Sequence, residues 1–506
     1  MPMKTERTSD RARCISLLGA CLITAGRLFA QDGTLDVTFS GDGQYGFMPQ
    51  IPDVITTEIL ETDGDIFAFL TPVNGTPSSY IIKLNADGSL SNNFGIGGIL
   101  ELPAIGITDA VVAPDGTGIH LLIGDTAGYL IGTMDLNGTM VGPWTPVNTP
   151  GGGGFAKMLA DEQGRIVIGK GAYFNGDTYG QVIRLDPDFS QDLSFGINGA
   201  ALTPGPPFCY PLMEIDNLGR ILLGSYQPGC AGMWRFNTDG TLDTSFNYTL
   251  DLTPFIQDNW IIDFAIAQDN SIYLQPNTYA YPSYLFKLQE NGSVDTNFGT
   301  GGHIILEDPE PLWYTAPDEL LIEPGGGLIV LAPAYLNGSM QGKWLARLDA
   351  SGVLDPDFDP GIQPIDDQGY ALRINFHCAT LQADGKVLSM DQVGKWQGGS
   401  LLGWAPLITR FTNEKGAVGI APNDAGPRVE QAIAFPNPTQ GVTALRASDP
   451  GAWQHATVVI TNTAGAVVLE GPLVNGTMDL SALAGGVYTC RVQHAGGSVY
   501  ARVVKQ

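Results

Sequence analysis

The sequence predicts an all-β fold, a seven-bladed β-propeller of four-stranded blades followed by a small β-sandwich C-terminal domain. A strand–turn–strand unit recurs seven times between Val54 and Met390, and a turn-rich segment recurs between its copies. Helical patterning is almost absent, and 66 glycines and 34 prolines suit short strands joined by tight turns. Internal repetition outranks other sequence signals, because each unit has to bury its faces against the next copy.

The turn-rich segment, here called the anchor, starts at a basic residue and ends at an aromatic residue eleven positions later. Its clearest copies run from Lys83 to Phe94, Arg184 to Phe195, Arg235 to Phe246, Lys287 to Phe298 and Arg347 to Phe358. A degenerate copy runs from Thr133 to Trp144. A truncated first copy holds Gly33, Leu35, Asp36 and Phe39, and a decaying last copy is Arg410-Phe411-Thr412-Asn413. Eight anchors then enclose seven intervals of about 50 to 63 residues.

The anchor residues are those that a tight reversal requires. Pairs such as Asp239-Gly240 and Asn291-Gly292 supply the left-handed backbone of a turn. The leucine and the aromatic residue that follow, for example Leu242 and Phe246, are expected to reach back into the core. The aspartate between them, Asp243 in the same copy, is expected to cap backbone N–H groups.

Each interval is expected to hold four antiparallel strands, which is typical of a propeller blade. In the first interval these are 54–60, 65–70, 79–84 and 98–102. The second strands of the later copies are expected at 118–124, 165–169, 220–224, 271–275, 328–332 and 386–390. The last copy ends at Phe411 with three strands, so the unclaimed strand Gly43–Met48 is expected to complete it and close the ring.

The anchors resemble the delta-60 repeat, a bacterial family of units with a Gly-x-Leu-Asp-x-x-Phe-Gly core. The best copies are residues 291–299 and 32–39, whereas Trp144 and Phe189 depart from the pattern. The resemblance covers roughly residues 31–420. It implies a secreted or surface-exposed propeller-like array and carries over no catalytic residues.

The first 30 residues have the layout of an export signal, with a basic start, a short apolar stretch and Ala30 before the expected cleavage point. A lipoprotein signal that acylates Cys21 is the alternative. A propeller is expected over 31–416, a linker over 417–428 and a separate tail over 429–506. No later segment is long and apolar enough to cross a membrane. The net charge of −27 argues against nucleic acid as a partner.

The motifs of the tail resemble the C-terminal sorting domain of type IX secretion. The residues that match it are Pro436, Asn437, Pro438, Gly441, Gly465, Gly486 and Tyr488. The resemblance implies contact with the type IX machinery, passage across the outer membrane of a Bacteroidota-type bacterium, removal of the tail, and release or surface attachment. An ordinary immunoglobulin-like domain would explain each motif singly, but not all of them in order.

The sequence contains no recognisable catalytic motif. Asp186, Asp188, Ser190 and Asp192 form a weak candidate for a calcium site, with turn capping as the alternative, and no other cofactor is indicated. Cys209 and Cys230 flank one hairpin and are candidates for a disulfide. Loop aromatics, among them Trp260, Trp313 and Trp396, are expected to pad the junctions between blades; the alternative is that they bind a glycan or a surface protein.

We therefore expect an exported binding or structural module of the cell surface or the extracellular space. The rival hypothesis is a polysaccharide lyase or glycosidase that acts in the central channel of the propeller. That hypothesis requires two or more carboxylates, or Tyr, His or Arg side chains, to converge in the channel.

Overall fold

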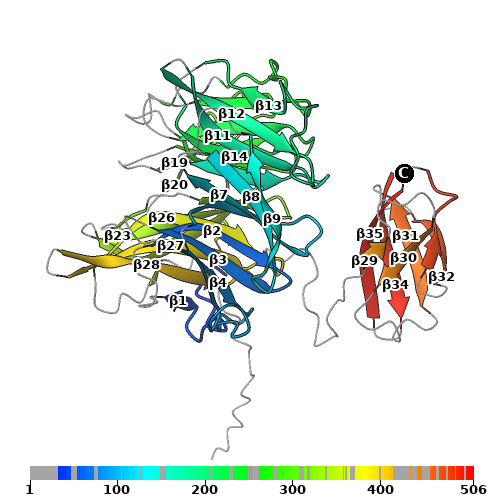
Figure 1. Cartoon of the computed structure of the whole chain (residues 1–506), viewed down its shortest axis with the longest axis horizontal. Coiled ribbons are helices and arrows are strands. Elements are labelled where there is room, and N and C mark those ends of the chain that lie inside the picture. Colours follow the sequence, from blue (N-terminus) through cyan, green and yellow to red (C-terminus); the bar gives the residue numbers. More distant parts are fainter. Residues whose placement is uncertain are drawn as a thin grey trace, which may run out of the picture. The chain divides into compact units, whose positions relative to one another are not determined.

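The computed structural model describes residues 32–46, 54–72, 78–103, 105–125, 128–148, 155–174, 176–205, 208–226, 232–248, 250, 252, 261–276, 283–306, 313–315, 319–336, 339–356, 358, 362–364, 371–397, 400–413, 433–435, 442–446, 456–462, 467–473, 477–484, 486–494 and 497–505. These residues contain no helix, and all their paired strands are antiparallel (Figure 1). The chain divides into two compact units, residues 1–418 and 419–506, each of which is described by itself.

The first unit begins with small sheets whose strands follow sequence order. Four of them have four strands and one has three in the described part of the chain. Their strands are β2 (Val54–Thr62), β3 (Asp65–Pro72), β4 (Ser78–Leu84) and β5 (Ile99–Pro103); β6 (Ile107–Val112), β7 (Gly118–Asp125), β8 (Gly128–Asp135) and β9 (Met140–Val147); β10 (Ala156–Ala160), β11 (Ile166–Phe174), β12 (Asp177–Leu185) and β13 (Ala200–Leu202); β14 (Tyr210–Ile215), β15 (Ile221–Tyr226) and β16 (Gly232–Phe236); and β17 (Ile261–Ile266), β18 (Ile272–Pro276), β19 (Ser283–Leu288) and β20 (His303–Leu306).

The remaining strands of the first unit form one nine-stranded sheet. They are β21 (Trp313–Thr315), β22 (Glu319–Ile322), β23 (Leu328–Leu336), β24 (Ser339–Leu348), β25 (Gln363–Pro364), β26 (Ala371–Leu381), β27 (Val387–Gln397), β28 (Ser400–Phe411) and β1 (Gln44–Gly46). Its two halves, β21–β25 and β26–β28 with β1, are joined by a single pair, Met340 opposite Leu372. Each half therefore corresponds to one repeat.

The first strands of the repeats contact one another in cyclic order. β2 contacts β6, β6 contacts β10, and the series continues through β14, β17, β22 and β26 back to β2. Apolar side chains fill the spaces between successive sheets: the core that contains Phe39, Ile59 and Ile82 also includes Leu388 and Met390 of the last repeat. The first and last repeats are therefore neighbours (Figure 1).

The N-terminal strand closes this cycle. Gln44, Tyr45 and Gly46 of β1 pair with Thr409, Ile408 and Leu407 of β28. This confirms that the strand expected at Gly43–Met48 completes the last repeat, although Phe47 and Met48 lie outside the described residues. The last sheet thus contains strands from both ends of the first unit.

The expected count of eight anchors was wrong, because the first and last copies are two halves of one anchor. The backbone N–H of Asp36 donates to the carbonyl of Arg410 at 2.9 Å, as the N–H of Asp243 donates to the carbonyl of Arg235 at 2.8 Å within an intact copy. Arg410 Nε also donates to Asp36 Oδ2 at 2.8 Å, and its guanidinium lies 4.7 Å from the ring centroid of Phe39. We call this split copy the composite anchor.

The basic residue of each anchor links its repeat to the next one. Five of these residues donate to a backbone carbonyl in the turn of the following repeat: Lys83 to Leu136, Arg184 to Thr238, Arg235 to Glu290, Lys287 to Ala350 and Arg410 to Ala86. Arg347 instead donates to the side chain of Asn413 at 2.7 Å. Because Ala86 belongs to the first repeat, the bond from Arg410 closes the series.

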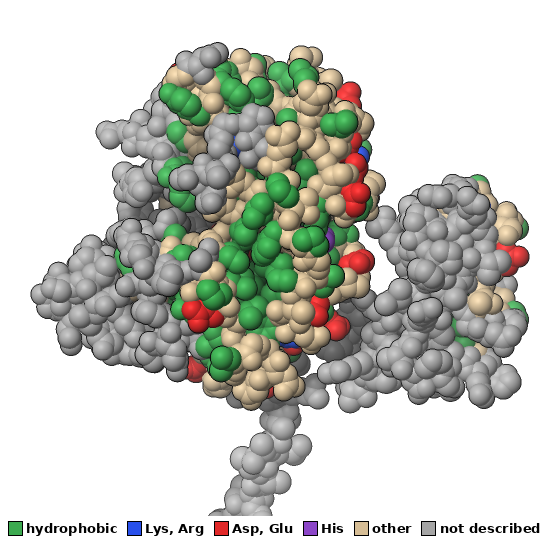
Figure 2. Space-filling model, in the orientation of Figure 1, with side chains coloured by type: hydrophobic (Ala, Val, Ile, Leu, Met, Phe, Trp, Pro, Cys, Tyr) green, Lys and Arg blue, Asp and Glu red, His purple; other side chains and the backbone are tan. Residues whose placement is uncertain are grey.

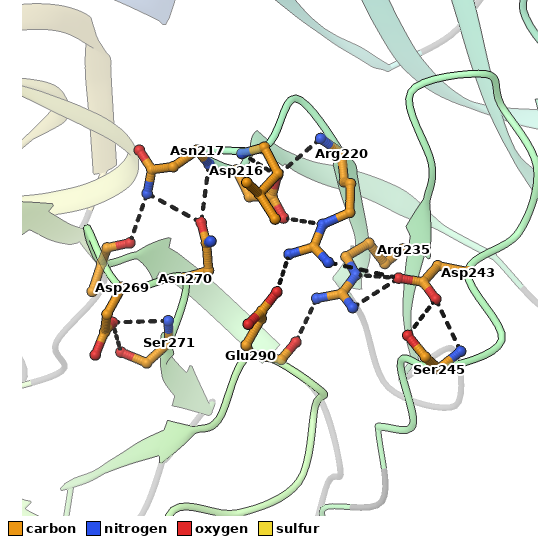
Figure 3. Close-up of polar contacts among 12 residues, drawn as sticks. Asp216, Asn217, Arg220, Arg235, Asp243, Ser245, Asp269, Asn270, Ser271 and Glu290 are labelled. Carbon is orange, nitrogen blue, oxygen red and sulfur yellow. Dashed lines mark hydrogen bonds and ion pairs between the residues drawn. The ribbon is translucent and has the colours of Figure 1, made fainter.

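One such junction, between the fourth and fifth repeats, is drawn in Figure 3. The guanidinium of Arg235 pairs with Asp243 at 2.7 Å and bonds to the carbonyl of Glu290. Arg220 joins the Asp216 and Glu290 carboxylates, at 2.7 Å from each. The junction therefore consists mainly of charge-assisted hydrogen bonds, which are stronger than those between neutral groups.

The anchor side chains divide between the core and the surface. Phe246 and Phe358 are buried as expected. Leu242 and Leu354 are 37% and 45% exposed, so the expectation that these two leucines reach the core was wrong, whereas Leu90 of another copy does pack against it. Asp243 Oδ1 accepts from Ser245 N at 2.9 Å, which confirms the capping role. Its other oxygen binds Arg235, and this ion pair was not anticipated.

The second unit contains two antiparallel sheets. One consists of β29 (Ile433–Phe435), β30 (Val442–Arg446) and β33 (Thr477–Asp479); the other of β32 (Val467–Pro472), β31 (Thr457–Asn462), β34 (Gly486–His494) and β35 (Gly497–Lys505). Met478 of β33 packs in one apolar core with Val458, Ile460 and Cys490 of the other sheet.

We predict that Arg410→Ala lowers the free energy of unfolding of the full chain by about 3–5 kcal/mol, because it removes the closer of the two cations of the buried Asp36 carboxylate and leaves only Lys386, at 3.6 Å. Arg165→Ala is the matched control, since Arg165 pairs with Asp161 inside one turn and keeps a quarter of its side chain exposed, and we expect a smaller loss, of about 1 kcal/mol. Urea denaturation measures both. Equal losses would contradict the role assigned to the composite anchor.

Candidate functional site

The strand registers align one position on the first strand of every repeat. The residue at this position lies opposite the same place on the second strand: Glu58 opposite Phe69, Asp109 opposite Leu122, Lys157 opposite Gly169, Leu212 opposite Gly224, Asp263 opposite Gln275, Glu319 opposite Leu331 and Cys378 opposite Met390. We call these seven residues the axial ring. Five of them are charged residue types, although their strands are otherwise mostly apolar.

Lys157 is the electrostatic centre of the axial ring. Its Nζ lies 2.5 Å from Glu58 Oε2 and 3.7 Å from Asp109 Oδ1. These contacts join the first, second and third repeats through one ammonium group. Among the described residues of the ring, Lys157 is the one basic side chain, and four acidic residues accompany it.

Two ring aspartates also bind the backbone of the next repeat. Asp109 Oδ2 accepts from Met158 N at 2.5 Å, and Asp263 Oδ2 accepts from Leu320 N at 2.8 Å. A register shift lies just before each aspartate and turns the strand locally. The aspartates thus satisfy backbone N–H groups on the inner edges of the neighbouring strands.

Burial raises the pKa of two ring aspartates and of one glutamate beside the ring. Burial raises the pKa of Asp109 to about 7, although Lys157 opposes the shift. Burial likewise raises the pKa of Asp263 to about 7 and that of Glu214, two residues beyond Leu212, to about 7. The pKa of Lys157 is held well above its usual value by Asp109 and Glu58, against the effect of burial.

This arrangement has the acid–base properties that proton transfer requires, because carboxyl groups that titrate near neutral pH can both donate and accept protons. It does not form an evident metal site. Within the part of the chain that the structure describes, no group of three or more His, Cys, Asp or Glu residues is placed to hold a metal ion.

A second buried polar cluster joins the sixth and seventh repeats. Lys343 Nζ lies 2.7 Å from Asp391 Oδ1 and also donates to Ser389 Oγ. Each of the three residues is at most 1% exposed. The cluster is closed to solvent, so its role is to link β24 with β27 rather than to bind a ligand.

The predicted calcium ligands form turn caps. Asp188 Oδ1 accepts from Ser190 N and Oγ at 2.9 and 2.6 Å, and Asp192 pairs with Arg184 at 2.7 Å. Asp186 contributes its backbone to the same turn. In Figure 2 the acidic side chains of the first unit lie mostly along the right-hand edge of the face and do not form one compact patch.

Several other predicted residues are described only in part. Cys209 is disulfide-bonded, but Cys230, the partner that the sequence suggests, lies outside the described residues, so this pairing stays a prediction. The export signal and the side chains of Trp260, Trp313 and Trp396 also lie outside the described residues, so the roles expected for them stay predictions. In the described part of the chain, no helix is long and apolar enough to cross a membrane.

The sorting motif is partly visible in the second unit. Tyr488 is buried, and its hydroxyl donates to the carbonyl of Ala484 at 2.8 Å. Gly486 begins β34, opposite Lys505. Both residues therefore shape the fold of the tail. The remaining motif residues, Pro436, Asn437, Pro438, Gly441 and Gly465, lie outside the described residues.

Sequence reasoning missed the axial ring. Each ionisable residue of the ring is isolated in a mostly apolar strand, and an isolated charged residue matches no recognisable sequence motif. The available signal was positional. When the repeats are aligned on the first Ile, Leu or Val of the second strand, the ring residue lies eight to ten positions earlier, for example Glu58 before Ile66 and Lys157 before Ile166.

Two family profiles match the chain. Residues 433–506 match the family described as "Secretion system C-terminal sorting domain". The tail is confirmed as a type IX sorting domain. Residues 219–246, which contain one complete anchor, match the family described as "Domain of unknown function (DUF5122) beta-propeller". The chain is thus a secreted propeller protein that the type IX system delivers to the cell surface or the extracellular space.

Solved structures with a similar chain course are propellers and proteins that contain them. PorZ, a surface component of the type IX secretion system of Porphyromonas gingivalis, has 16% identity and a TM-score of 0.41; the match covers 89% of this chain and 59% of PorZ. The polysaccharide lyase Uly1 has 11% identity and a TM-score of 0.45, with 73% and 91% covered. The β-propeller domain of the Trilobed protease from Pyrococcus furiosus has 11% identity and a TM-score of 0.40, with 68% and 96% covered.

This chain therefore spans about three fifths of the length of PorZ. No curated protein matches the chain.

We predict that Lys157→Met destabilises the protein more at pH 8 than at pH 5. At pH 8 the Glu58 and Asp109 carboxylates lose their cation, whereas at pH 5 Asp109, whose pKa is about 7, is largely protonated. Because 38% of the Lys157 side chain stays accessible, we expect a loss of about 1–3 kcal/mol at pH 8 and less than about 1 kcal/mol at pH 5.

Urea denaturation at the two pH values measures this difference. Lys157→Arg is the matched control, since it retains the positive charge and should keep most of the stability at pH 8. Equal losses for Lys157→Met at both pH values would contradict the electrostatic role of Lys157.

Proposed function

We propose that this protein is an extracellular or cell-surface binding or structural module, built as a seven-bladed propeller and delivered by its C-terminal sorting domain. The observation that carries the proposal is the sorting-domain match over residues 433–506. In this proposal the tail contacts the type IX secretion machinery and is removed on export. The mature protein is then released or attached to the surface.

The proposed blade count rests on two observations. The first strands of seven repeats contact one another in a cycle that returns to β2, and the composite anchor takes its two halves from the two ends of the first unit. A further blade would have to interrupt one of these contacts. The two sheets of the second unit share one core, which supports the proposed small β-sandwich.

The proposed domain limits are an export signal at 1–30, the propeller at 31–416, a linker at 417–428 and the sorting domain at 429–506. The boundary between the two compact units, after Val418, falls inside this linker and supports the division. Whether the N-terminal segment is cleaved after Ala30 or acylated at Cys21 does not change the route.

A second candidate function is a glycosidase or polysaccharide lyase that acts at the centre of the propeller. It is favoured by the convergence of Glu58 and Asp109 on Lys157 and by the raised pKa values of Glu214 and Asp263. A glycosidase needs one carboxylic acid that donates a proton and one carboxylate that acts as base or nucleophile. Glu214 and Asp263 are the residues to which we would assign proton transfer.

We predict that deletion of residues 419–506 abolishes delivery to the surface or medium in a bacterium with a type IX system. The shortened protein should remain in the periplasm in folded form, because the first unit has its own core and closure. Immunoblots of cell fractions and medium measure this. Unchanged appearance of the shortened protein outside the cell would overturn the proposed route.

We predict that the full chain binds at least one polysaccharide class on a glycan array without degrading it, if the protein is a binding module. The array is read with and without calcium, which also tests the Asp186–Asp192 turn. Release of reducing ends or unsaturated products, lost in Glu214→Gln and Asp263→Asn, would favour the enzyme instead. The absence of both binding and turnover would leave the structural role.

A further inference from the structure

A pocket lies beside the anchor of the sixth repeat. Its volume is about 480 Å³, within the range of about 300–1,000 Å³ that is typical of small-ligand sites. Two turns form its walls: the turn between β22 and β23, from Glu323 to Gly327, and the anchor turn that follows β24, from Asp349 to Pro356. The walls combine carboxylates with exposed apolar side chains, because Val353 and Leu354 are 61% and 45% exposed.

The glycine that ends the first of these turns stands where two other repeats have an arginine. Gly327 directly precedes β23, and Arg165 and Arg220 directly precede β11 and β15. The turns are closed in the same way, because the backbone N–H of an acidic residue donates to the carbonyl of the last residue: Glu323 to Gly327 at 2.8 Å, and Asp216 to Arg220 at 2.9 Å. The sixth repeat thus has the same turn without the basic side chain.

Arg220 shows how a guanidinium fits between the two turns of a repeat. Its nitrogens lie 2.7 Å from Asp216, 2.7 Å from Glu290 and 4.0 Å from Asp243, the anchor aspartate (Figure 3). Because Arg235 also pairs with Asp243, two cations face three carboxylates at this junction. A planar guanidinium suits such a place, since its donors can reach several carboxylates at once.

The pocket of the sixth repeat contains a buried carboxylate that its neighbours satisfy only in part. The Arg347 guanidinium lies 2.6 Å from Asp355 and 3.2 Å from Asp32, but 3.9 Å from Glu323 Oε1. The Glu323 side chain is 8% exposed. Its Oε1 accepts from the side chain of Asn413 at 2.9 Å, whereas within the described part of the chain no group donates to its Oε2. The buried Oε2 therefore has room for a donor from outside the chain.

We propose that this pocket binds an arginine side chain of a partner protein. The guanidinium donates to Glu323 Oε2, in the way that Arg220 donates to carboxylates within the fourth repeat. The aliphatic stem lies on Val353 and Leu354, because arginine packs its methylene groups on apolar surface while its charged end stays solvated. The net charge of −27 favours encounter with a basic partner. The site is separate from the axial ring, so the inference goes beyond the proposed function and holds for a binding module, a structural module or an enzyme.

The test titrates the full chain with the N-acetyl methylamides of arginine, lysine and citrulline and follows binding by ligand-observed NMR. Citrulline has the shape of arginine without its charge, and lysine has the charge without the planar fork. We expect the arginine compound to bind at least about tenfold more tightly than the other two, because it alone combines charge with the fork. Its affinity should fall as salt is added. Absence of arginine binding, or equal binding of the lysine compound, would overturn the proposal.

Gly327→Arg places the arginine in the chain itself and locates the site. The backbone of Gly327 does not have a positive φ, so it accepts a side chain. An added Cβ would lie 2.3 Å from Glu323 Oε2, which Glu323→Asp in the same chain relieves while reproducing the pair of Asp216 and Arg220. We expect this double variant to melt at or above the temperature of the unchanged protein and to bind the arginine compound at least about tenfold more weakly. Unchanged affinity would overturn the proposal.

Glu323→Gln keeps the test decisive if the double variant folds poorly. The amide oxygen of glutamine can still accept from Asn413, so the fold is retained while the charge is removed. We expect arginine binding to weaken at least about fivefold, since a hydrogen bond to a charged group is lost. Glu162→Gln is the matched control, because Glu162 is exposed in the turn of the third repeat, and it should leave the affinity unchanged. Equal affinities of both variants would contradict the assigned site.

Discussion

The fold of the first unit depends on the bond between its two ends. Arg410, near the end of the last repeat, pairs with Asp36 and lies over Phe39, and both of those residues precede the first repeat. The same guanidinium bonds to the carbonyl of Ala86 in the turn of the first repeat. One buried cation therefore links the end of the last repeat to two segments that lie 374 and 324 positions earlier in the chain. Beside it, β1 covers the edge of β28, which would otherwise be an unpaired strand.

Closure of the ring also brings charged side chains together in a poorly solvated place at its centre. Bringing the inner strands together places four acidic residues and one lysine at one level, and burial then shifts carboxyl groups towards their protonated forms. Charges that are poorly solvated are tolerated only when they are paired or neutralised. The third repeat supplies Lys157, which pairs with Glu58 and Asp109. In the fifth repeat, Asp263 accepts a hydrogen bond from Leu320 N of the next repeat.

The sequence was sufficient to predict the repeat, the strands and the closure, because all of them follow from local turn chemistry and hydrophobic periodicity. The strand expected at 65–70 is β3, and the strand expected at Gly43–Met48 pairs with β28. The sorting tail could be predicted because several short motifs occur in a fixed order. The two additional strands β29 and β30 escaped notice, since each is short and lies beside proline-rich sequence.

The side-chain chemistry could not be predicted in the same way. The role of Arg235 as a link to the next repeat depends on which carbonyl it reaches, about fifty residues ahead. Glu58 and Lys157 meet although 99 positions separate them, and only a closed ring brings them together. Local pattern indicates where a strand lies, but the neighbours of a buried charge are decided by the topology.

The closed ring is tested most directly by a cysteine pair at Gln44 and Thr409, which lie opposite each other in the β1–β28 pairing. Opposite residues of an antiparallel pair have Cα atoms about 4.5–5.5 Å apart, within the reach of a disulfide. The account predicts that mild oxidation of the Gln44→Cys, Thr409→Cys protein gives an intramolecular cross-link in the monomer, identified by peptide mapping. Free thiols at both positions, or cross-links only between two chains, would show that the first unit is not closed by its own N-terminal strand.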